Sequence, residues 1–97
     1  MAVGLITDPA EAEGIVARGD AELVALGRPL VTDPAWPAKA RAGRGDIRYC
    51  VSCNSCWGRI TEHATLACDN NPRVAQPDET DYWPARATRC RRVVVVG

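Results

Sequence analysis

The 97-residue chain has 12 basic and 12 acidic side chains, a formal net charge of zero and 46% hydrophobic residues. A chain of this length is sufficient for one small domain. Its mixed charges argue against a nucleic-acid or membrane-surface partner. No stretch approaches the ~20 apolar residues of a membrane helix, and the N-terminus lacks the pattern of a signal peptide. We therefore expect a cytoplasmic protein with reduced thiols.

The first part of the chain shows a strand–helix–strand pattern. Residues 2–6 and 23–26 are short apolar runs that predict strands. Between them, Asp8 precedes Pro9 and is followed three residues later by Glu11, which together predict a capped helix start. Gly19 is the expected end of that helix. Two strands joined through a helix predict parallel pairing, the arrangement of α/β proteins.

Glycine and arginine stand at the expected carboxyl ends of both strands. Gly4 lies in the first apolar run, and Gly27 and Arg28 follow the second. Such a glycine exposes backbone N–H groups, and an adjacent arginine can bind phosphate oxygens in a bidentate manner. In (β/α)8 barrels the phosphate site follows strands 7 and 8, beside a short extra helix. A helical stretch that follows Pro34 and runs to about Ala42 fits that layout. The alternative is an ordinary βαβ unit with Arg28 as a surface charge.

Four cysteines dominate the middle of the chain. Cys50, Cys53 and Cys56 are spaced by two residues, and Cys68 follows after eleven more. Three closely spaced thiolates and one remote thiolate are a common ligand set for a 4Fe–4S cluster. Structural zinc sites more often use two separated Cys-x2-Cys pairs, but zinc stays open as an alternative. A disulfide framework needs an oxidising compartment and would leave one of five cysteines unpaired.

The aromatic residues and the single histidine have simpler expected roles. Trp36 is expected to pack the last helix of the barrel portion against the rest. Trp57 directly follows a predicted ligand and is expected to shield the cluster. His63 is expected to be a solvated or hydrogen-bonded loop residue rather than a ligand.

The C-terminal part is expected to connect domains. Residues 76–91 are polar, with Tyr82 and Trp83 as expected anchors, and Cys90 fits no ligand spacing. The run RRVVVVG at residues 91–97 predicts a buried strand. Because such a strand needs a partner, we expect the chain to be a segment of a longer enzyme.

These motifs, in this order, resemble a known protein family. The segments ALGRPL, IRYCVSCNSCWGRI, LACDNNPRV and RRVVVVG resemble the multidomain flavoproteins of the Old Yellow Enzyme superfamily. The relevant branch includes trimethylamine dehydrogenase, 2,4-dienoyl-CoA reductase and related N-demethylases, and the cysteine spacing is more similar to the first. Leu5 departs from the polar or basic residue that many relatives have there.

The resemblance implies an α/β fold with four regions. Residues 1–48 would be the last two β/α units of an FMN-binding (β/α)8 TIM barrel. Residues 49–75 would be an irregular cluster-binding segment, and residues 76–91 a linker. Residues 92–97 would begin a Rossmann-like dinucleotide-binding domain for FAD, or for ADP in some members.

The resemblance also implies the cofactors and their ligands. Gly4, Gly27 and Arg28 would bind the FMN phosphate, and Cys50, Cys53, Cys56 and Cys68 would hold the 4Fe–4S cluster. The parent enzyme would act on a small-molecule substrate, would exchange electrons with NAD(P)H or an electron-transfer protein, and could be a homo-oligomer. The family takes its catalytic acids and bases from earlier barrel strands, so no catalytic residue is named and the chain alone is expected to be inactive. The competing hypothesis is a zinc-stabilised binding module with the same four ligands. A third hypothesis is a truncated product that binds nothing.

Overall fold

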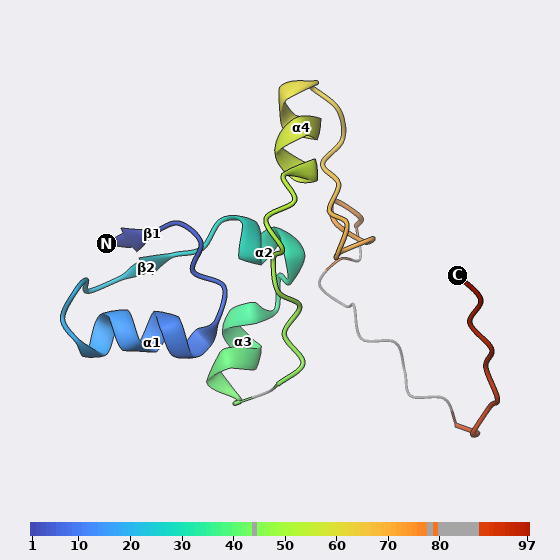
Figure 1. The fold of residues 1–97 in the computed structure, drawn as a ribbon, viewed down its shortest axis with the longest axis horizontal. Coiled ribbons are helices and arrows are strands. Elements are labelled where there is room, and N and C mark those ends of the chain that lie inside the picture. Colours follow the sequence, from blue (N-terminus) through green and yellow to red (C-terminus); the bar gives the residue numbers. More distant parts are fainter. Residues whose placement is uncertain (44, 78, 80–87) are drawn as a thin grey trace.

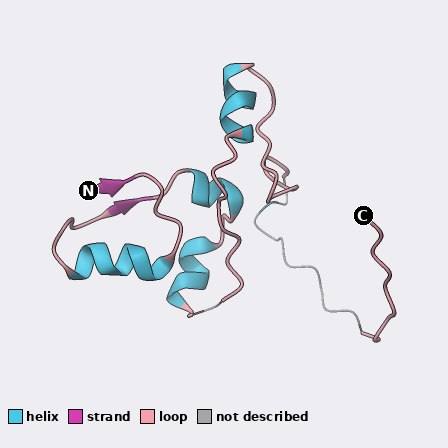
Figure 2. Ribbon diagram, in the orientation of Figure 1, coloured by secondary structure: helices cyan, strands magenta, loops and turns pink. Residues whose placement is uncertain are grey.

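The computed structural model describes residues 1–43, 45–77, 79 and 88–97. Its elements follow the order β1 (Ala2–Val3), α1 (Pro9–Ala17), β2 (Val24–Ala25), α2 (Arg28–Thr32), α3 (Trp36–Arg41) and α4 (Ser55–Thr61). Figure 1 shows α1 beside the two strands, with α2 and α3 leading from β2 towards the long segment that carries α4. Loops join these short elements (Figure 2).

The two strands form a small parallel sheet. Ala2 pairs with Val24 and Val3 with Ala25. Both strands are shorter than the predicted apolar runs. For β1 the reason is the backbone, because Gly4 and Leu5 have φ values of 105° and 54° and therefore leave the extended region. The predicted strand–helix–strand order and parallel pairing are confirmed.

The ends of α1 follow the sequence signals. The carboxylate of Asp8 accepts a hydrogen bond of 2.7 Å from the backbone N–H of Ala10, which caps the first turn. At the other end Gly19 has a φ of 75° and its N–H bonds the carbonyl of Val16 at 3.0 Å. A left-handed glycine after the last turn is a common helix stop. The predicted start at Asp8 and end at Gly19 are therefore confirmed.

The core lies between the sheet unit and α3. Ile6, Ala12, Trp36 and Ile47 form its buried cluster. Trp36 is also fixed by a hydrogen bond of 2.8 Å from its Nε1–H to the carbonyl of Thr7. The predicted packing of Trp36 against the first unit is confirmed. This contact places α2 and the chain that follows α3 close to the carboxyl ends of the strands.

The segment after β2 contains one helix that was not expected, and the cysteine segment is more regular than expected. The helical stretch predicted after Pro34 is found as α3, with Ala42 at its C-terminal cap. The additional helix α2 ends before Asp33, which precedes Pro34 and takes an extended conformation (φ −140°, ψ 94°). Residues 49–75 are not irregular throughout, because α4 occupies Ser55–Thr61. Its formation depends on Asn54, which turns the chain in a left-handed conformation just before the helix.

The C-terminal residues leave one prediction open. Residues 88–97 carry no helix or strand, and Val93, Val94, Val95 and Val96 are 78–91% exposed. A strand needs a hydrogen-bonded partner, so the Rossmann strand at residues 92–97 stays a prediction, as do the region boundaries. Tyr82 and Trp83 lie outside the described residues. Within the described part, no helix has the length and apolar character needed to cross a bilayer.

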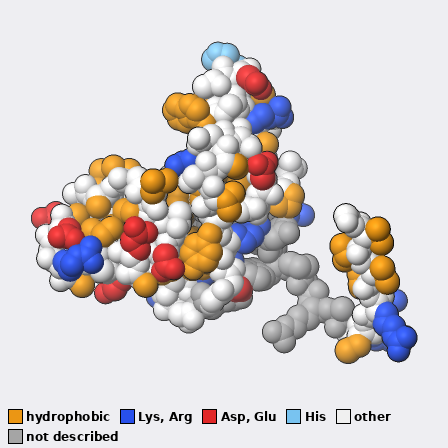
Figure 3. Space-filling model, in the orientation of Figure 1, with side chains coloured by type: hydrophobic (Ala, Val, Ile, Leu, Met, Phe, Trp, Pro, Cys, Tyr) orange, Lys and Arg blue, Asp and Glu red, His pale blue; other side chains and the backbone are white. Residues whose placement is uncertain are grey.

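Hydrophobic side chains also remain exposed around the sheet. Met1, Val3, Leu5 and Leu23 are between 66% and 76% exposed. Figure 3 shows hydrophobic patches interspersed with charged groups over this face of the molecule. The two-stranded sheet therefore buries only part of its apolar surface.

Candidate cofactor sites

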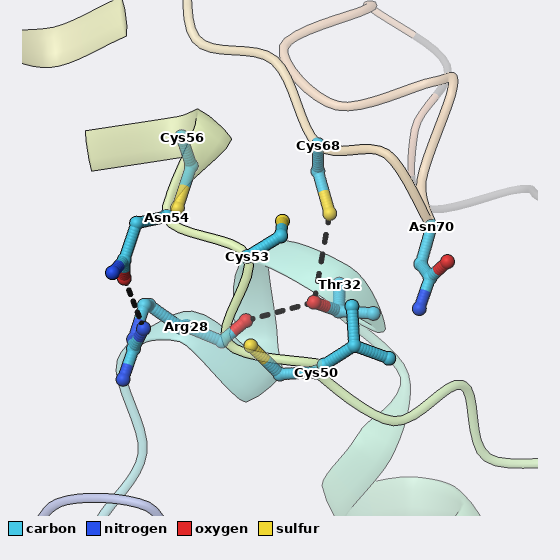
Figure 4. Close-up of a pocket in the computed structure, with 9 residues that line it drawn as sticks. Arg28, Thr32, Cys50, Cys53, Asn54, Cys56, Cys68 and Asn70 are labelled. Carbon is cyan, nitrogen blue, oxygen red and sulfur yellow. Dashed lines mark hydrogen bonds between the residues drawn. The ribbon is translucent and has the colours of Figure 1, made fainter. Parts of the chain in front are cut away.

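The four predicted cysteine ligands line one pocket. Cys50, Cys53, Cys56 and Cys68 share it with Arg28, Thr32, Val51, Asn54 and Asn70. Figure 4 shows the four cysteine side chains around a common space, reached from the loop before α4, from α4 itself and from the returning chain. The four side chains therefore share one pocket, and their role as metal ligands stays a prediction.

Two left-handed residues shape the first three positions. Ser52 has a φ of 55° and Asn54 a φ of 64°. Left-handed conformations are uncommon for residues with a side chain, although asparagine tolerates them better than most. They bend the chain between Cys50 and Cys56, and α4 then begins with Cys56 in its first turn. A fully extended loop could not direct three sulfurs at one space.

Cys68 is placed by Asn71, which is fully buried. The two residues form an isolated antiparallel bridge, and the N–H of Asn71 bonds the carbonyl of Cys68 at 3.1 Å. The side-chain amide of Asn71 donates to the carbonyl of Val31 at 2.8 Å and to Oε1 of Glu79 at 2.8 Å. Asn71 thus links residues 68–71, the Cys68 arm, to α2.

Two further hydrogen bonds join the two arms of the cysteine segment. The hydroxyl of Ser55 donates to Oδ2 of Asp69 at 2.7 Å, and Nδ2 of Asn70 donates to the carbonyl of Tyr49 at 3.0 Å. Hydrogen bonds from Ser55 and from the thiol of Cys53 hold the pKa of Asp69 below its usual value. Each arm is therefore held to the other directly beside a cysteine.

A buried ion pair supports the start of the cysteine segment. Asp33 is 1% exposed and Lys39 is 4% exposed, and they form a salt bridge. The carboxylate of Asp33 also accepts the backbone N–H of Arg48 at 3.0 Å and that of Ala35 at 3.1 Å. Burial raises the pKa of Asp33, but the hydrogen bonds from Lys39 and Arg48 outweigh burial and leave that pKa below its usual value. Asp33 stays ionised and fixes the chain two residues before Cys50.

The predicted phosphate-binding residues line a second pocket. Gly4, Gly27 and Arg28 come from the carboxyl ends of β1 and β2, which meet at one edge because the strands are parallel. Cys50 and Trp57 line the same pocket. Trp57 is 63% exposed, so most of its ring is accessible on this side of the cysteine loop.

The two pockets adjoin. Arg28 and Cys50 line both of them. Nη1 of Arg28 donates a hydrogen bond of 2.6 Å to Oδ1 of Asn54, the residue between Cys53 and Ser55 (Figure 4). An arginine at the strand ends is thereby tied to the loop that carries three of the thiols.

The donor set in the cysteine pocket, four thiols, has the chemistry of a cluster site. Among the described residues, no three His, Cys, Asp or Glu side chains are grouped so that they could hold one metal ion. A zinc ion requires all four sulfurs at ~2.3 Å from one atom. In a 4Fe–4S cluster each iron takes one thiolate, so the four sulfurs surround a larger core. The pocket offers four thiols, one for each iron of such a cluster.

Other predicted residues lie away from both pockets. His63 is exposed after α4, as expected for a solvated loop residue. Cys90 is exposed and lines neither pocket, and all five cysteines are free thiols.

Sequence reasoning missed the structural roles of Thr32, Asp33 and Asn71. The clearest signal was the Asp-Asn-Asn-Pro stretch at residues 69–72, which indicated a turn but not the contact that its buried Asn71 makes with α2.

The first half of the chain matches a known protein family. Residues 1–46 match the NADH:flavin oxidoreductase / NADH oxidase family. The match contains Gly4, Gly27 and Arg28, the three residues predicted to bind the flavin phosphate. The predicted relation to Old Yellow Enzyme-like flavin oxidoreductases is therefore confirmed.

Several named relatives match 82–98% of the chain. An NADH oxidase of Thermoanaerobacter brockii is 45% identical over 98% of the chain. A cinnamate reductase of Clostridium sporogenes is 33% identical over 97%, and a dimethylamine dehydrogenase of Hyphomicrobium is 35% identical over 82%. The chain spans 13–15% of the length of these relatives. All three are oxidoreductases by name, which does not favour a zinc-binding interaction module.

Proposed function

We propose that this chain forms the phosphate end of an FMN site and supplies the four ligands of a 4Fe–4S cluster in an oxidoreductase. In this proposal the cluster relays electrons between FMN and a second redox partner. The observation that carries the proposal is the adjacency of the two pockets, which share Arg28 and Cys50. FMN exchanges a hydride or electrons with substrate and an iron–sulfur cluster exchanges single electrons, so neighbouring sites suit a relay.

The residues at the strand ends bind and orient the phosphate. Gly4 has a φ of 105°, and a Cβ added there would meet no other atom within 4 Å, so its backbone is open to a ligand. Gly27 is equally open. The guanidinium of Arg28 offers a planar fork of donors that matches phosphate oxygens. Because Arg28 also bonds Asn54, binding of a phosphate there fixes one side of the cysteine loop.

The residues of the second pocket hold four thiolates in place. Cys50, Cys53 and Cys56 are set by the left-handed turns at Ser52 and Asn54, and Cys68 is set by Asn71. A coordinating thiol is deprotonated, so ligation gathers negative charge beside Arg28. The guanidinium offsets part of that charge and keeps the two sites electrostatically coupled.

The substrate class follows from what the relatives are named for. One is named for the reduction of cinnamate and another for the dehydrogenation of dimethylamine. We infer that the parent enzyme is an amine dehydrogenase or demethylase, or an enoate or dienoyl reductase. Residues 92–97 would lead into a domain for FAD or ADP, and NAD(P)H or an electron-transfer protein would be the second redox partner. In the family that these motifs resemble, the substrate-activating groups come from earlier barrel strands, so we propose that these 97 residues alone show no turnover.

Serine substitutions test the ligand assignment. After anaerobic reconstitution, Cys50→Ser and Cys68→Ser should each lower the bound iron and sulfide and bleach the visible absorption. Cys90→Ser is the matched control, because Cys90 lines neither pocket, and it should keep the full content. Equal iron loss in all three variants, or in none, would remove the basis of the proposal.

A further inference from the structure

Thr32 is the one hydroxyl residue among those that line the cysteine pocket. It ends α2 and is only 2% exposed. Its Oγ1 lies 3.6 Å from Sγ of Cys68, which is within hydrogen-bond range for sulfur. Figure 4 shows the two side chains pointing toward each other across the pocket wall. This contact joins α2 to the ligand that is most remote in sequence.

The single proton of the hydroxyl decides what this contact can do. Oγ1 of Thr32 also lies 3.1 Å from the carbonyl of Arg28, to which it can donate. While Cys68 is a thiol, either atom of the Thr32–Cys68 pair can be the donor. A cysteine bound to iron has lost its proton and can only accept. Because charged acceptors form the stronger hydrogen bonds, ligation should turn the Thr32 proton from the Arg28 carbonyl to Sγ of Cys68.

The position of Thr32 relative to Cys68 is well fixed. Asn71, three residues after Cys68, bonds the carbonyl of Val31, the residue before Thr32, at 2.8 Å. The same asparagine pairs with Cys68 through the isolated bridge. The hydroxyl and the sulfur are therefore held by one buried residue, in surroundings where a hydrogen bond is stronger than in water.

We propose that Thr32 tunes the reduction potential of the cluster by donating a hydrogen bond to the thiolate of Cys68. The proposal depends on the 4Fe–4S assignment above. A donor at a ligand sulfur stabilises the reduced cluster, which has one more negative charge, more than the oxidised cluster. Hydrogen bonds to the sulfurs are among the factors that set cluster potentials. Thr32 is a positioning residue that acts on the cluster through its ligand, and it raises the potential.

The test compares hydroxyl-bearing and hydroxyl-free side chains at this position. Thr32→Val keeps the shape of threonine and removes the donor, whereas Thr32→Ser restores the donor. Thr61→Val is the matched control, because Thr61 ends α4 with a hydroxyl that donates only to the carbonyl of Gly58 at 2.8 Å in the described contacts. Each protein is reconstituted anaerobically, assayed for iron and sulfide, and titrated for its midpoint potential by visible absorption.

We expect Thr32→Val to shift the midpoint potential to a lower value with unchanged iron content. Thr32→Ser should lie near the wild-type potential, and Thr61→Val should match it. An unchanged potential in Thr32→Val with a complete cluster would overturn the role of Thr32 and leave the cluster assignment standing. Absence of iron and sulfide from the wild-type chain would instead overturn the cluster assignment. If the cluster assembles in Thr32→Ser but in neither Thr32→Val nor Thr32→Ala, the hydroxyl is needed to retain the cluster. That result would overturn the tuning role.

Discussion

Arg28 and Asn54 are joined by a 2.6 Å hydrogen bond between Nη1 and Oδ1, although 26 residues separate them in the sequence. Arg28 stands at the end of β2 and Asn54 stands between two predicted cluster ligands. The bond therefore connects the strand ends to the cysteine loop. A ligand that binds the guanidinium of Arg28 from the side of the strands should therefore also change the position of the cysteine loop.

Arg28→Met should remove the preference of the chain for FMN over riboflavin. The two flavins differ by the phosphate, and charge-assisted hydrogen bonds to a phosphate are worth about 1.5–3 kcal/mol, or about tenfold or more in affinity. Binding measured by flavin fluorescence quenching gives the ratio of the two affinities. Arg18→Met is the control, since Arg18 follows α1 with Asp20 as its partner, and should keep the ratio. Equal affinity of the wild-type chain for both flavins would contradict the phosphate role of Arg28.

Asn71→Ala should destabilise the fold. It leaves the carbonyl of Val31 and the carboxylate of Glu79, both in part-buried hydrogen bonds, without the amide donor, at a cost of about 2 kcal/mol in the free energy of unfolding. Asn70→Ala removes one exposed hydrogen bond and should cost less than ~1 kcal/mol. Urea denaturation followed by tryptophan fluorescence measures both. Similar losses in the two variants would show that Asn71 is not the anchor of the Cys68 arm.

Lys39→Met should lower the free energy of unfolding more than the loss of a surface ion pair does. It removes the close cationic partner of the buried Asp33 carboxylate and leaves the guanidinium of Arg48 at 4.0 Å, and the loss of one partner of a buried ion pair typically costs about 3 kcal/mol or more. Arg18→Met breaks an exposed pair whose side chains are 64% and 55% accessible, and should cost at most ~1 kcal/mol. Urea denaturation gives the free energy of unfolding of Lys39→Met and of Arg18→Met. A loss in Lys39→Met no greater than that in Arg18→Met would argue against a structural role for the buried pair.

The contribution of Asp33 should disappear in acid. Its pKa is lower in the folded chain than its ordinary value of 3.8, so the unfolded chain binds the proton more readily. The stabilisation is therefore complete above pH 3.8 and is lost as the pH falls through the folded pKa. The difference in unfolding free energy between wild type and Asp33→Asn should be largest above that pH and should narrow below it. A difference that does not change with pH would mean that ionisation of Asp33 contributes nothing.

The features that the sequence predicted are those set by local signals. The helix signals at Asp8 and Gly19 act within a few residues, and both are found in the fold. The close spacing of Cys50, Cys53 and Cys56 likewise brings these three residues to one pocket. Long-range contacts were not predictable in this way. Thr32 and Cys68 are 36 residues apart and Val31 and Asn71 are 40 apart, and both contacts depend on the direction in which α2 leaves the sheet.

Two misjudged regions have equally physical causes. The short helix α2 was not predicted, and it ends where Pro34 restricts the backbone of Asp33. The helix α4 was missed because the cysteines around it indicated a loop and its residues show no strong apolar period. The valines of residues 93–96 show the reverse case, in which strong strand propensity yields no strand among the described residues.

Metal and sulfide analysis of the anaerobically purified or reconstituted chain tests the central claim most directly. The cluster assignment predicts about four iron and four sulfide per chain, with broad absorption in the visible range. One zinc per chain, no sulfide and no colour would contradict it and would return the four cysteines to a structural site.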